Sequence, residues 1–254
     1  MPIVLGDRAN IEQSLPFLNG GQQDDVAFAE TRFAKPDGYG VMFTNGTGTG
    51  KTYSGLGIAY RFARQGKGNV LIAVPTQKVM EDWIRSGKNL GLDITALDGT
   101  RDNGRKGMAV TTYANLGQND SLGRRDWDLV ITDESHYLMQ EKDGNPTTFL
   151  HNLRAISMHP RGVLRLTEMR HPKELQAFKE VHARIDAMMR AKRPEAEILV
   201  VRRSAVPINK AWADAQGKVK GAVEAAQGPA RTRVVFLSAT PFAYEKNVDY
   251  AEGY

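Results

Sequence analysis

The sequence contains no cysteine, which excludes several kinds of chemistry at once. Without thiols the chain cannot form disulfides, a thiolate zinc site or a cysteine nucleophile. The five histidines show no paired metal-ligand spacing, so we expect no zinc site; they are His136, His151, His159, His171 and His182.

Long hydrophobic runs are also missing. The best apolar run covers residues 70–75, far short of the roughly 18 residues that a membrane span needs. The first residues, MPIVLGDRAN, have no basic segment followed by an apolar one, so no signal peptide is expected. These two absences predict a cytoplasmic protein that is not secreted and has no membrane partner.

Neither the composition nor the charge is extreme. The 254 residues are 41% hydrophobic and 25% charged, which is typical of a soluble globular protein and excludes disorder as the main state. The net charge of +5 is unevenly spread, however. Residues 161–233 hold 16 Lys and Arg against 8 Asp and Glu, whereas the rest of the chain holds 18 against 21. The positive excess therefore lies in one segment and points to a polyanionic partner.

Five short apolar runs punctuate the chain, at residues 40–44, 69–74, 108–112, 128–132 and 234–238. Continuous runs rich in β-branched residues are typical of strands buried on both faces of a parallel sheet. Helical spacing lies between them, at residues 51–64, 77–90 and 147–156. This alternation predicts a doubly wound α/β domain with a mainly parallel sheet, whose ligands bind at the carboxyl ends of the strands.

Residues 161–233 break this rhythm. Helical patterns cover residues 171–192 and about 205–226, with a short apolar run at 198–201 between them. We therefore expect a basic, mostly helical insertion within a single domain that spans residues 1–254. Three interpretations of this insertion stay open: it contacts nucleic acid, it is a solvated helical hairpin, or it binds a protein partner.

A glycine-rich segment, NGTGTGKT at residues 45–52, follows the first predicted strand and opens a helix. Its glycines let backbone N–H groups turn toward phosphate oxygens, and the helix N-terminus presents its positive dipole end to the same anion. In this pattern Lys51 reaches the β- and γ-phosphates and the Thr52 hydroxyl binds Mg²⁺. Asn45 stands where the pattern has Gly or Ala, and asparagine tolerates unusual backbone angles. The segment predicts a nucleotide-phosphate site.

An acidic pair, Asp133 and Glu134, comes directly after the apolar run at residues 128–132. A carboxylate at the end of a buried strand of the same sheet is placed to hold Mg²⁺ through Asp133. Glu134 would then polarise an attacking water as general base. Solvated Asp-Glu pairs are common, but the buried strand before this pair and the glycine-rich loop upstream favour the functional interpretation.

Three segments in this order resemble motifs I, II and III of superfamily 2 helicases and translocases: NGTGTGKT (45–52), DESH (133–136) and SATP (238–241). Weaker similarities agree: LNGGQ (18–22) with the segment whose glutamine contacts adenine, Pro75-Thr76 with motif Ia, and Thr111-Thr112-Tyr113 with motif Ib. The resemblance is to a DEAD/DEAH-like, Swi/Snf-like or strawberry-notch-like branch, and the DESH form favours the last two. Such domains also occur in large phage and plasmid proteins. The resemblance implies the first RecA-like P-loop domain of such a motor.

The resemblance also implies a role for each matching residue. Cofactor binding, with ATP and Mg²⁺ as cofactors, would fall to Gln22 at the adenine and to Gly46, Thr47, Gly48, Thr49, Gly50, Lys51 and Thr52 at the phosphates. The catalytic residues would be Lys51, Asp133 and Glu134, with Asp133 and Thr52 on the metal ion. Coupling of the nucleotide state to strand movement would involve His136, Ser238 and Thr240. The nucleic-acid backbone would lie near Thr76, Thr111 and Thr112.

The family engine has two RecA-like domains with ATP between them, and the second supplies arginine fingers. Nothing after Thr240 resembles the arginine-bearing motif, so we interpret the chain as the first half of the motor. It would be the ATP-binding half of a nucleic-acid-dependent ATPase, hydrolysing ATP when a second RecA-like domain joins it in cis or in trans. On its own it would be weak or inactive. The expected nucleic acid is DNA rather than RNA.

Two other interpretations are kept beside this one. The chain could be a non-catalytic nucleotide-binding scaffold or interaction module of a larger phage or plasmid protein. It could also be another P-loop NTPase, such as an AAA-type remodeller, although the SATP and LNGGQ segments speak against that class.

Overall fold

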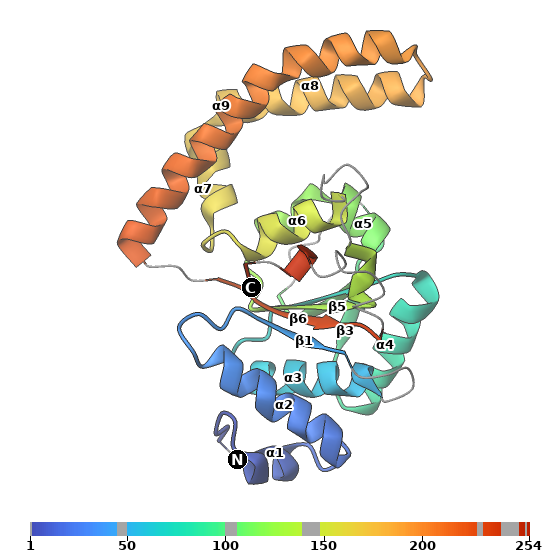
Figure 1. Cartoon of the computed structure of the whole chain (residues 1–254), viewed down its shortest axis with the longest axis vertical. Coiled ribbons are helices and arrows are strands. Elements are labelled where there is room, and N and C mark those ends of the chain that lie inside the picture. Colours follow the sequence, from blue (N-terminus) through green and yellow to red (C-terminus); the bar gives the residue numbers. More distant parts are fainter. Residues whose placement is uncertain are drawn as a thin grey trace. The chain divides into compact units, whose positions relative to one another are not determined.

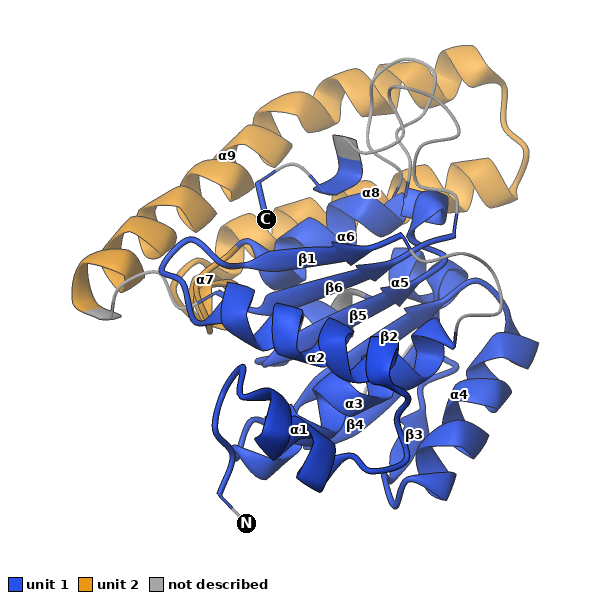
Figure 2. Cartoon of the chain, turned by 60° about the horizontal axis from the view of Figure 1, so that its bottom comes forward, with its two compact units in different colours: residues 1–158, 231–254 blue, residues 159–230 orange. Residues whose placement is uncertain are grey.

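The chain was analysed as a computed structural model, which describes residues 2–44, 50–99, 106–138, 148–227, 231–239, 249–251 and 253–254. It forms two compact units (Figure 2). Unit 1 comprises Met1–Met158 and Arg231–Tyr254, and unit 2 comprises His159–Ala230. None of the helices in the described part of the chain has the length and hydropathy that a bilayer crossing requires.

Unit 1 is built on a six-stranded sheet in the order β1-β6-β5-β2-β4-β3, in which every neighbouring pair is parallel. The strands are β1 (Gly40–Phe43), β2 (Val70–Val74), β3 (Ile94–Ala96), β4 (Met108–Thr112), β5 (Leu129–Asp133) and β6 (Arg233–Leu237). The predicted doubly wound, parallel α/β fold is confirmed, and all five predicted runs are strands. Among the strands of the described residues, β3 alone was not predicted, because its three residues form no continuous apolar run.

Helices cover both faces of this sheet (Figure 1). One face carries α2 (Gly20–Phe33), α3 (Lys51–Arg64) and α4 (Gln77–Asn89), with α1 (Arg8–Ser14) packed on α2. The other face carries α5 (Tyr113–Gln118), η1 (Asp120–Arg124), η2 (Ser135–Leu138), α6 (Thr148–Ser157) and η3 (Asp249–Ala251). The helix predicted at residues 51–64 has the same bounds in the structure, that at 77–90 ends one residue earlier, and that at 147–156 is shifted by one residue at both ends.

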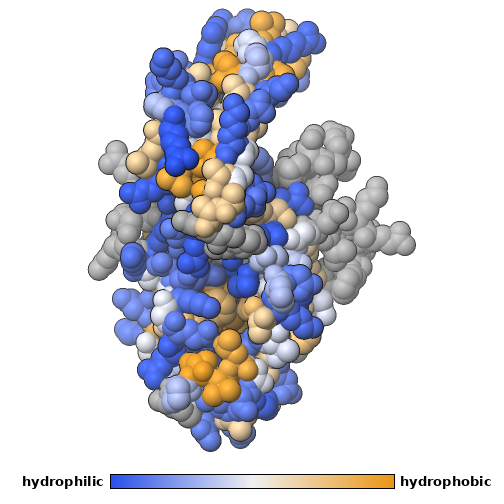
Figure 3. Space-filling model, turned by 90° about the vertical axis from the view of Figure 1, so that its left-hand side faces the viewer, coloured by the Kyte–Doolittle hydropathy of each residue, from blue (hydrophilic) through white to orange (hydrophobic). Residues whose placement is uncertain are grey.

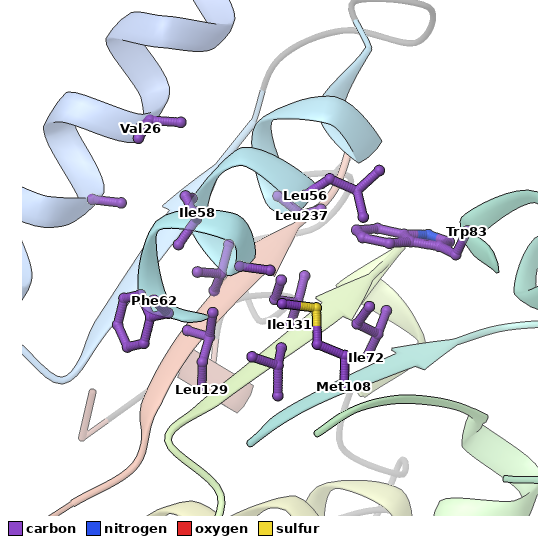
Figure 4. Packing of buried hydrophobic residues seen from close by; sticks show 14 of the residues in the cluster. Val26, Leu56, Ile58, Phe62, Ile72, Trp83, Met108, Leu129, Ile131 and Leu237 are labelled. Carbon is purple, nitrogen blue, oxygen red and sulfur yellow. The ribbon is translucent and has the colours of Figure 1, made fainter. Parts of the chain in front are cut away.

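The strands of unit 1 are continuous apolar runs because each contributes to two cores. In β2, Val70 and Ile72 point into the cluster under α3 and α4 (Figure 4), whereas Leu71 and Ala73 point into the cluster under α5 and α6. All four are fully buried. Successive side chains of a strand point to opposite faces, so a strand buried on both faces must be apolar at every position.

Unit 2 is helical. It contains α7 (Val163–Arg170), α8 (Pro172–Arg190) and the 33-residue α9 (Glu195–Gln227). The α8–α9 hairpin closes on a small set of apolar residues, Val181 and Ile185 of α8 with Val201 and Ala205 of α9, and a second small set joins α7 to α9. The apolar run predicted between two helices, at residues 198–201, lies inside α9, because this helix starts earlier than expected and continues through Pro207.

The surface of the hairpin is mixed rather than uniformly polar. Hydrophobic and hydrophilic side chains are interspersed on it, as the top of Figure 3 shows. The exposed large apolar residues of unit 2 are Met169, Met189, Leu199, Val200 and Val206. Unit 2 thus buries few apolar residues and leaves several in solvent.

Candidate active site

The strand order brings three functional segments to one edge of the sheet. Strand β6 lies between β1 and β5, and Leu237 pairs in register with Phe43 on one side and with Asp133 on the other. The glycine-rich loop, the SATP segment and the acidic pair therefore all begin at the same height, at the carboxyl ends of adjacent strands. Ligands of open α/β sheets bind at such an edge.

The N-terminus of α3 forms one side of this edge. Gly50 precedes the helix in the left-handed region (φ 78°), a conformation that glycine adopts without steric cost, and no side chain caps the helix. Lys51, the first helical residue, is only 9% exposed. The first backbone N–H groups of a helix generally lack intrahelical partners, although that of Tyr53 donates here to the Gly50 carbonyl (2.8 Å), so this terminus suits an anion. Of the other predicted phosphate ligands, Gly46, Thr47, Gly48 and Thr49 lie outside the described residues, and Thr52 lies in the first turn, half-buried.

Gln22 links α2 to the end of the glycine-rich loop. Asn19 caps α2, and the Gln22 amide oxygen accepts a hydrogen bond from the Asn19 backbone N–H (3.1 Å). The Gln22 Nε2 donates to the Gly50 carbonyl (3.3 Å). Both ends of the Gln22 amide are therefore engaged within the protein, next to the first turn of α3.

Asp133 ends β5 with its carboxylate held by two donors. Its Oδ2 accepts a hydrogen bond from Trp83 Nε1 (2.7 Å), and its Oδ1 accepts one from the Glu134 backbone N–H (3.0 Å). Burial raises the pKa of the Asp133 carboxyl above its ordinary value, whereas the hydrogen bond from Trp83 lowers it; the Glu134 charge raises the pKa and Lys51 lowers it. Lys51 is thus close enough to act electrostatically on Asp133.

Glu134 adopts an unusual backbone conformation, with φ at 50°. A non-glycine residue in the left-handed region stores strain, and such residues cluster at functional sites. Its Oε2 lies 3.3 Å from Nδ1 of His136, and the same nitrogen lies 3.4 Å from Oγ of the buried Ser238. The acidic pair and the SATP segment are therefore joined through His136. Thr240, predicted beside Ser238, lies outside the described residues.

The three threonines predicted near nucleic acid differ in position. Thr76 is exposed and Thr112 is half-buried, and each caps the N-terminus of the helix that follows it, α4 or α5. Thr111 is fully buried, and its hydroxyl donates to the Leu97 carbonyl (2.9 Å). Because Thr111 has no exposed atom to offer a strand, its expected contact with the nucleic-acid backbone does not fit the structure. Thr111 is buried because β4 is covered on both faces, and it lies on the same face as Ala109, which belongs to the cluster under α5 and α6.

Two aromatic residues at Asp133 were not predicted as part of the site. Trp83 packs between α4 and the sheet, and it also donates to the carboxylate. Tyr113 lay within a noted motif without a role, and its hydroxyl donates to the Asp133 backbone carbonyl (2.7 Å). The available signal was chemical, because a buried indole N–H or phenol O–H needs a hydrogen-bond partner.

The donor set fits a magnesium ion bound together with a nucleotide. Within the described residues, no group of three or more His, Cys, Asp or Glu side chains could hold a metal. Mg²⁺ in nucleotide sites takes one or two protein oxygens and completes its shell with phosphates and waters. Asp133 and Thr52 are oxygen donors of this kind, one at the end of β5 and the other in the first turn of α3.

A family model described as "Type III restriction enzyme, res subunit" (ResIII) matches residues 21–167, more than half of the chain. The chain belongs to this family. In the broader classification it is a superfamily 2 helicase-type domain, the first RecA-like domain of such a motor. No curated protein matches the chain.

Solved structures of two proteins are among those similar to the chain. The Sulfolobus solfataricus SWI2/SNF2 ATPase core matches both in complex with dsDNA (TM-score 0.46, 19% identity, 55% of this chain and 30% of that chain) and as the core domain (0.43, 16%, 55% and 29%). The UvsW helicase from bacteriophage T4 matches with a TM-score of 0.45 and 15% identity, over 61% of this chain and 56% of that chain. The chain spans less than two thirds of each. These scores are too low to assign function, so the family membership rests on the family model alone.

Proposed function

We propose that this chain is the ATP-binding half of a nucleic-acid-dependent motor and hydrolyses ATP with Mg²⁺ when a second RecA-like domain completes its site. One observation carries the proposal. The register of β1, β6 and β5 aligns Phe43, Leu237 and Asp133, so the phosphate loop, the acidic pair and the SATP segment meet at one sheet edge. Membership of a helicase family supports the same class of reaction.

In this proposal the phosphates lie at the N-terminus of α3. The backbone N–H groups of the loop and first turn would bind them, from Gly46 to Thr52, and Lys51 would neutralise their charge. The position of Lys51 supports this role, because it is the first residue of α3 and its charge acts on the carboxylate of Asp133, the proposed metal ligand. Asp133 and Thr52 would hold Mg²⁺, which offsets the phosphate charge that develops during transfer.

Glu134 is the proposed general base. Its side chain is 35% exposed, whereas Asp133 is buried, so Glu134 is the member of the pair that a water can reach. His136 and Ser238 would couple the Glu134 carboxylate to the end of β6, since His136 Nδ1 contacts both Glu134 and Ser238. Thr240 is proposed to act with them.

Gln22 keeps its proposed position beside the adenine, with one change. Its amide already bonds Asn19 and Gly50, so a base that Gln22 recognised would compete with one of these bonds. Substitution of Gln22 with Ala should therefore loosen the first turn of α3 and reduce the preference for ATP over GTP at the same time. A competition assay between the two nucleotides measures that preference.

Nucleic acid is the proposed polymeric partner, with DNA preferred over RNA. Exposed Thr76 and half-buried Thr112 cap helices at the carboxyl edge of the sheet, where a hydroxyl and the first-turn N–H groups suit a phosphate backbone. Unit 2 adds 14 Lys and Arg against 8 Asp and Glu. A cytoplasmic location follows as part of the same proposal, because ATP and nucleic acid are available there.

Calorimetric titration of the chain with Mg·ATP tests the nucleotide site. We expect binding by the wild-type chain and a loss on the order of tenfold or more in Lys51→Ala, since a charge-assisted contact is removed. Lys88→Ala removes an exposed lysine of α4 and serves as the matched control. Equal affinities of wild type and Lys51→Ala would contradict the proposal.

Steady-state ATPase measurements separate a motor from a scaffold. With a second RecA-like domain supplied in cis or in trans, a motor should hydrolyse ATP faster when DNA or RNA is added. Nucleotide binding without any stimulation would instead favour a non-catalytic scaffold of a larger protein.

A further inference from the structure

Two buried aromatic side chains converge on Asp133 from outside the phosphate loop. Trp83 of α4 is 1% exposed and donates its indole N–H to Asp133 Oδ2 at 2.7 Å. Tyr113, the first residue of α5, is 2% exposed and donates its hydroxyl to the Asp133 backbone carbonyl at 2.7 Å. One contact holds the carboxylate and the other holds the backbone that carries it.

The position of Trp83 is fixed by packing. Its ring lies in the core between α3, α4 and the sheet (Figure 4). A Cβ atom at Gly55 of α3 would approach the indole Cη2 to 2.8 Å, so the absence of a side chain there makes room for the ring. A tryptophan wedged in this way cannot turn its N–H elsewhere, and the indole nitrogen is a donor only. The direction of the hydrogen bond is therefore set by the fold.

Tyr113 is held just as firmly. Its ring stacks on Tyr137 with centroids 6.0 Å apart and planes at 13°, and it contacts Phe149 at 5.9 Å. Burial raises the pKa of the Tyr113 hydroxyl well above its ordinary value, with the Asp133 charge acting in the same direction, so the hydroxyl stays protonated and can donate. Its partner is the carbonyl of the last residue of β5.

With the Glu134 N–H on Oδ1 and Trp83 on Oδ2, the Asp133 carboxylate has a donor on each oxygen. Each oxygen keeps a second lone pair, and the orientation of that lone pair is fixed by the first bond. Partners that orient a ligating carboxylate commonly change metal affinity by about 10-fold to 100-fold when they are removed.

We propose that Trp83 and Tyr113 are positioning residues, which hold Asp133 in the orientation that a nucleotide-bound divalent cation requires. This inference rests on the proposed function. Both residues belong to helices whose N-cap residues, Thr76 and Thr112, are proposed to contact the nucleic-acid backbone. The same two helices would thus touch the nucleic acid at one end and the metal ligand through an aromatic side chain.

The test compares nucleotide affinity of the whole chain in Mg²⁺ and in EDTA, for Trp83→Phe, Tyr113→Phe and Trp127→Phe. Trp127 is the matched control, because it is also 1% exposed in unit 1 and donates its indole N–H, to the Leu122 carbonyl at 2.9 Å. We expect Trp83→Phe to reduce the gain in affinity that Mg²⁺ brings by about 10-fold. Tyr113→Phe should reduce it by a smaller factor, and affinity in EDTA should stay within about twofold of wild type for both.

Trp127→Phe should melt at a lower temperature than wild type, as Trp83→Phe should. Unlike Trp83→Phe, it should keep the full increase in nucleotide affinity that Mg²⁺ brings. A Trp83→Phe protein with the wild-type gain would overturn the inference. If Trp83→Phe does not fold, Tyr113→Phe decides, because it removes a single oxygen atom and leaves the ring stack in place. A wild-type chain that gains nothing from Mg²⁺ would overturn the proposed function and this inference together, whereas a normal wild-type gain with unchanged variants would overturn the inference alone.

Discussion

Units 1 and 2 use their residues in different ways. Unit 1 buries continuous apolar strands under helices on both faces and carries 20 Lys and Arg against 21 Asp and Glu. Unit 2 closes three helices on two small apolar sets and carries a charge of +6. Every described residue that we place in the chemistry belongs to unit 1. Unit 1 therefore carries the proposed chemistry at the ends of well-packed strands, whereas unit 2 offers a helical surface with a net positive charge.

The largest effect should come from the general base. Glu134→Gln in a protein completed by a second RecA-like domain should bind ATP normally but hydrolyse it about 10²–10⁴ times more slowly, because the amide cannot accept the proton of the attacking water. Rapid-quench measurements of a single turnover report this step directly. Turnover near the wild-type rate would remove Glu134 from its role and weaken the claim that the chemistry belongs to unit 1.

The loss of an ion pair should destabilise the fold far more in unit 1 than in unit 2. In unit 1, Arg61 Nε lies 2.6 Å from Glu30 Oε1 and both side chains are almost fully buried. Arg61→Ala leaves a buried carboxylate unpaired and should cost about 3–5 kcal/mol. In unit 2, Arg193 and Glu197 form an exposed pair at 3.0 Å, and Arg193→Ala should cost less than about 1 kcal/mol. Urea denaturation measures both, and similar costs would contradict the contrast between a packed and a solvated unit.

The removal of basic residues should weaken DNA binding more in unit 2 than in unit 1. Replacing four exposed basic residues of the hairpin with Ala (Arg190, Lys192, Arg203 and Lys210) should weaken DNA binding about 10-fold or more and lower its salt dependence. Each lost phosphate contact reduces the slope of log K against log salt by about 0.9. Fluorescence anisotropy over a salt series measures this slope.

The control for this prediction replaces four exposed basic residues of unit 1: Lys35, Arg64, Lys67 and Lys88. If the two sets weaken DNA binding equally, DNA responds to the net charge of the whole chain and unit 2 is no preferred binding surface. No effect of the hairpin set would favour the solvated hairpin or a protein partner, the two other interpretations of the basic segment.

The smallest effect concerns pH. Because burial raises the folded-state pKa of Asp133, its ionised form costs stability above the ordinary Asp pKa. That cost disappears as the pH falls through the raised pKa and the folded protein takes up the proton. Asp133→Asn removes this charge, but it also turns an amide NH2 toward one of the two donors, so the diagnostic quantity is the pH dependence of its stability relative to wild type. That relative stability should fall as the pH falls from neutral to acidic. Thermal melts of both proteins from pH 4 to 8 check the sign, and an Asp133→Asn protein that gains stability relative to wild type toward acid would refute it.

The sequence predicted the framework of unit 1 because its physical signals are local. Continuous apolar runs identify strands buried on both faces, and the lysine of the glycine-rich segment coincides with the first residue of α3. The short β3 gave no such signal, since only Ile94 of its three residues is buried. Helix α2 had a readable signal in the capping box of Asn19 and Gln22, which the sequence analysis interpreted only as an adenine contact.

The arrangement around Asp133 could not be predicted in this way. Trp83 and Asp133 are 50 positions apart, and no periodicity links them. The hydrogen bond between Ser135 and Tyr250 spans 115 positions and draws a residue near the C-terminus against the acidic segment. The left-handed backbone of Glu134 likewise depends on the surroundings that hold it. Such contacts depend on the strand order, which could not be predicted from the sequence alone.

Hydrogen–deuterium exchange of the whole chain, with and without Mg·ATPγS, tests the central claim most directly. The account predicts protection in unit 1 at the first turn of α3 and at the residues that follow β5, with unit 2 unchanged. Adding DNA should then protect the helices of unit 2. Nucleotide-dependent protection confined to unit 2, or absent from both segments of unit 1 while nucleotide is bound, would contradict it.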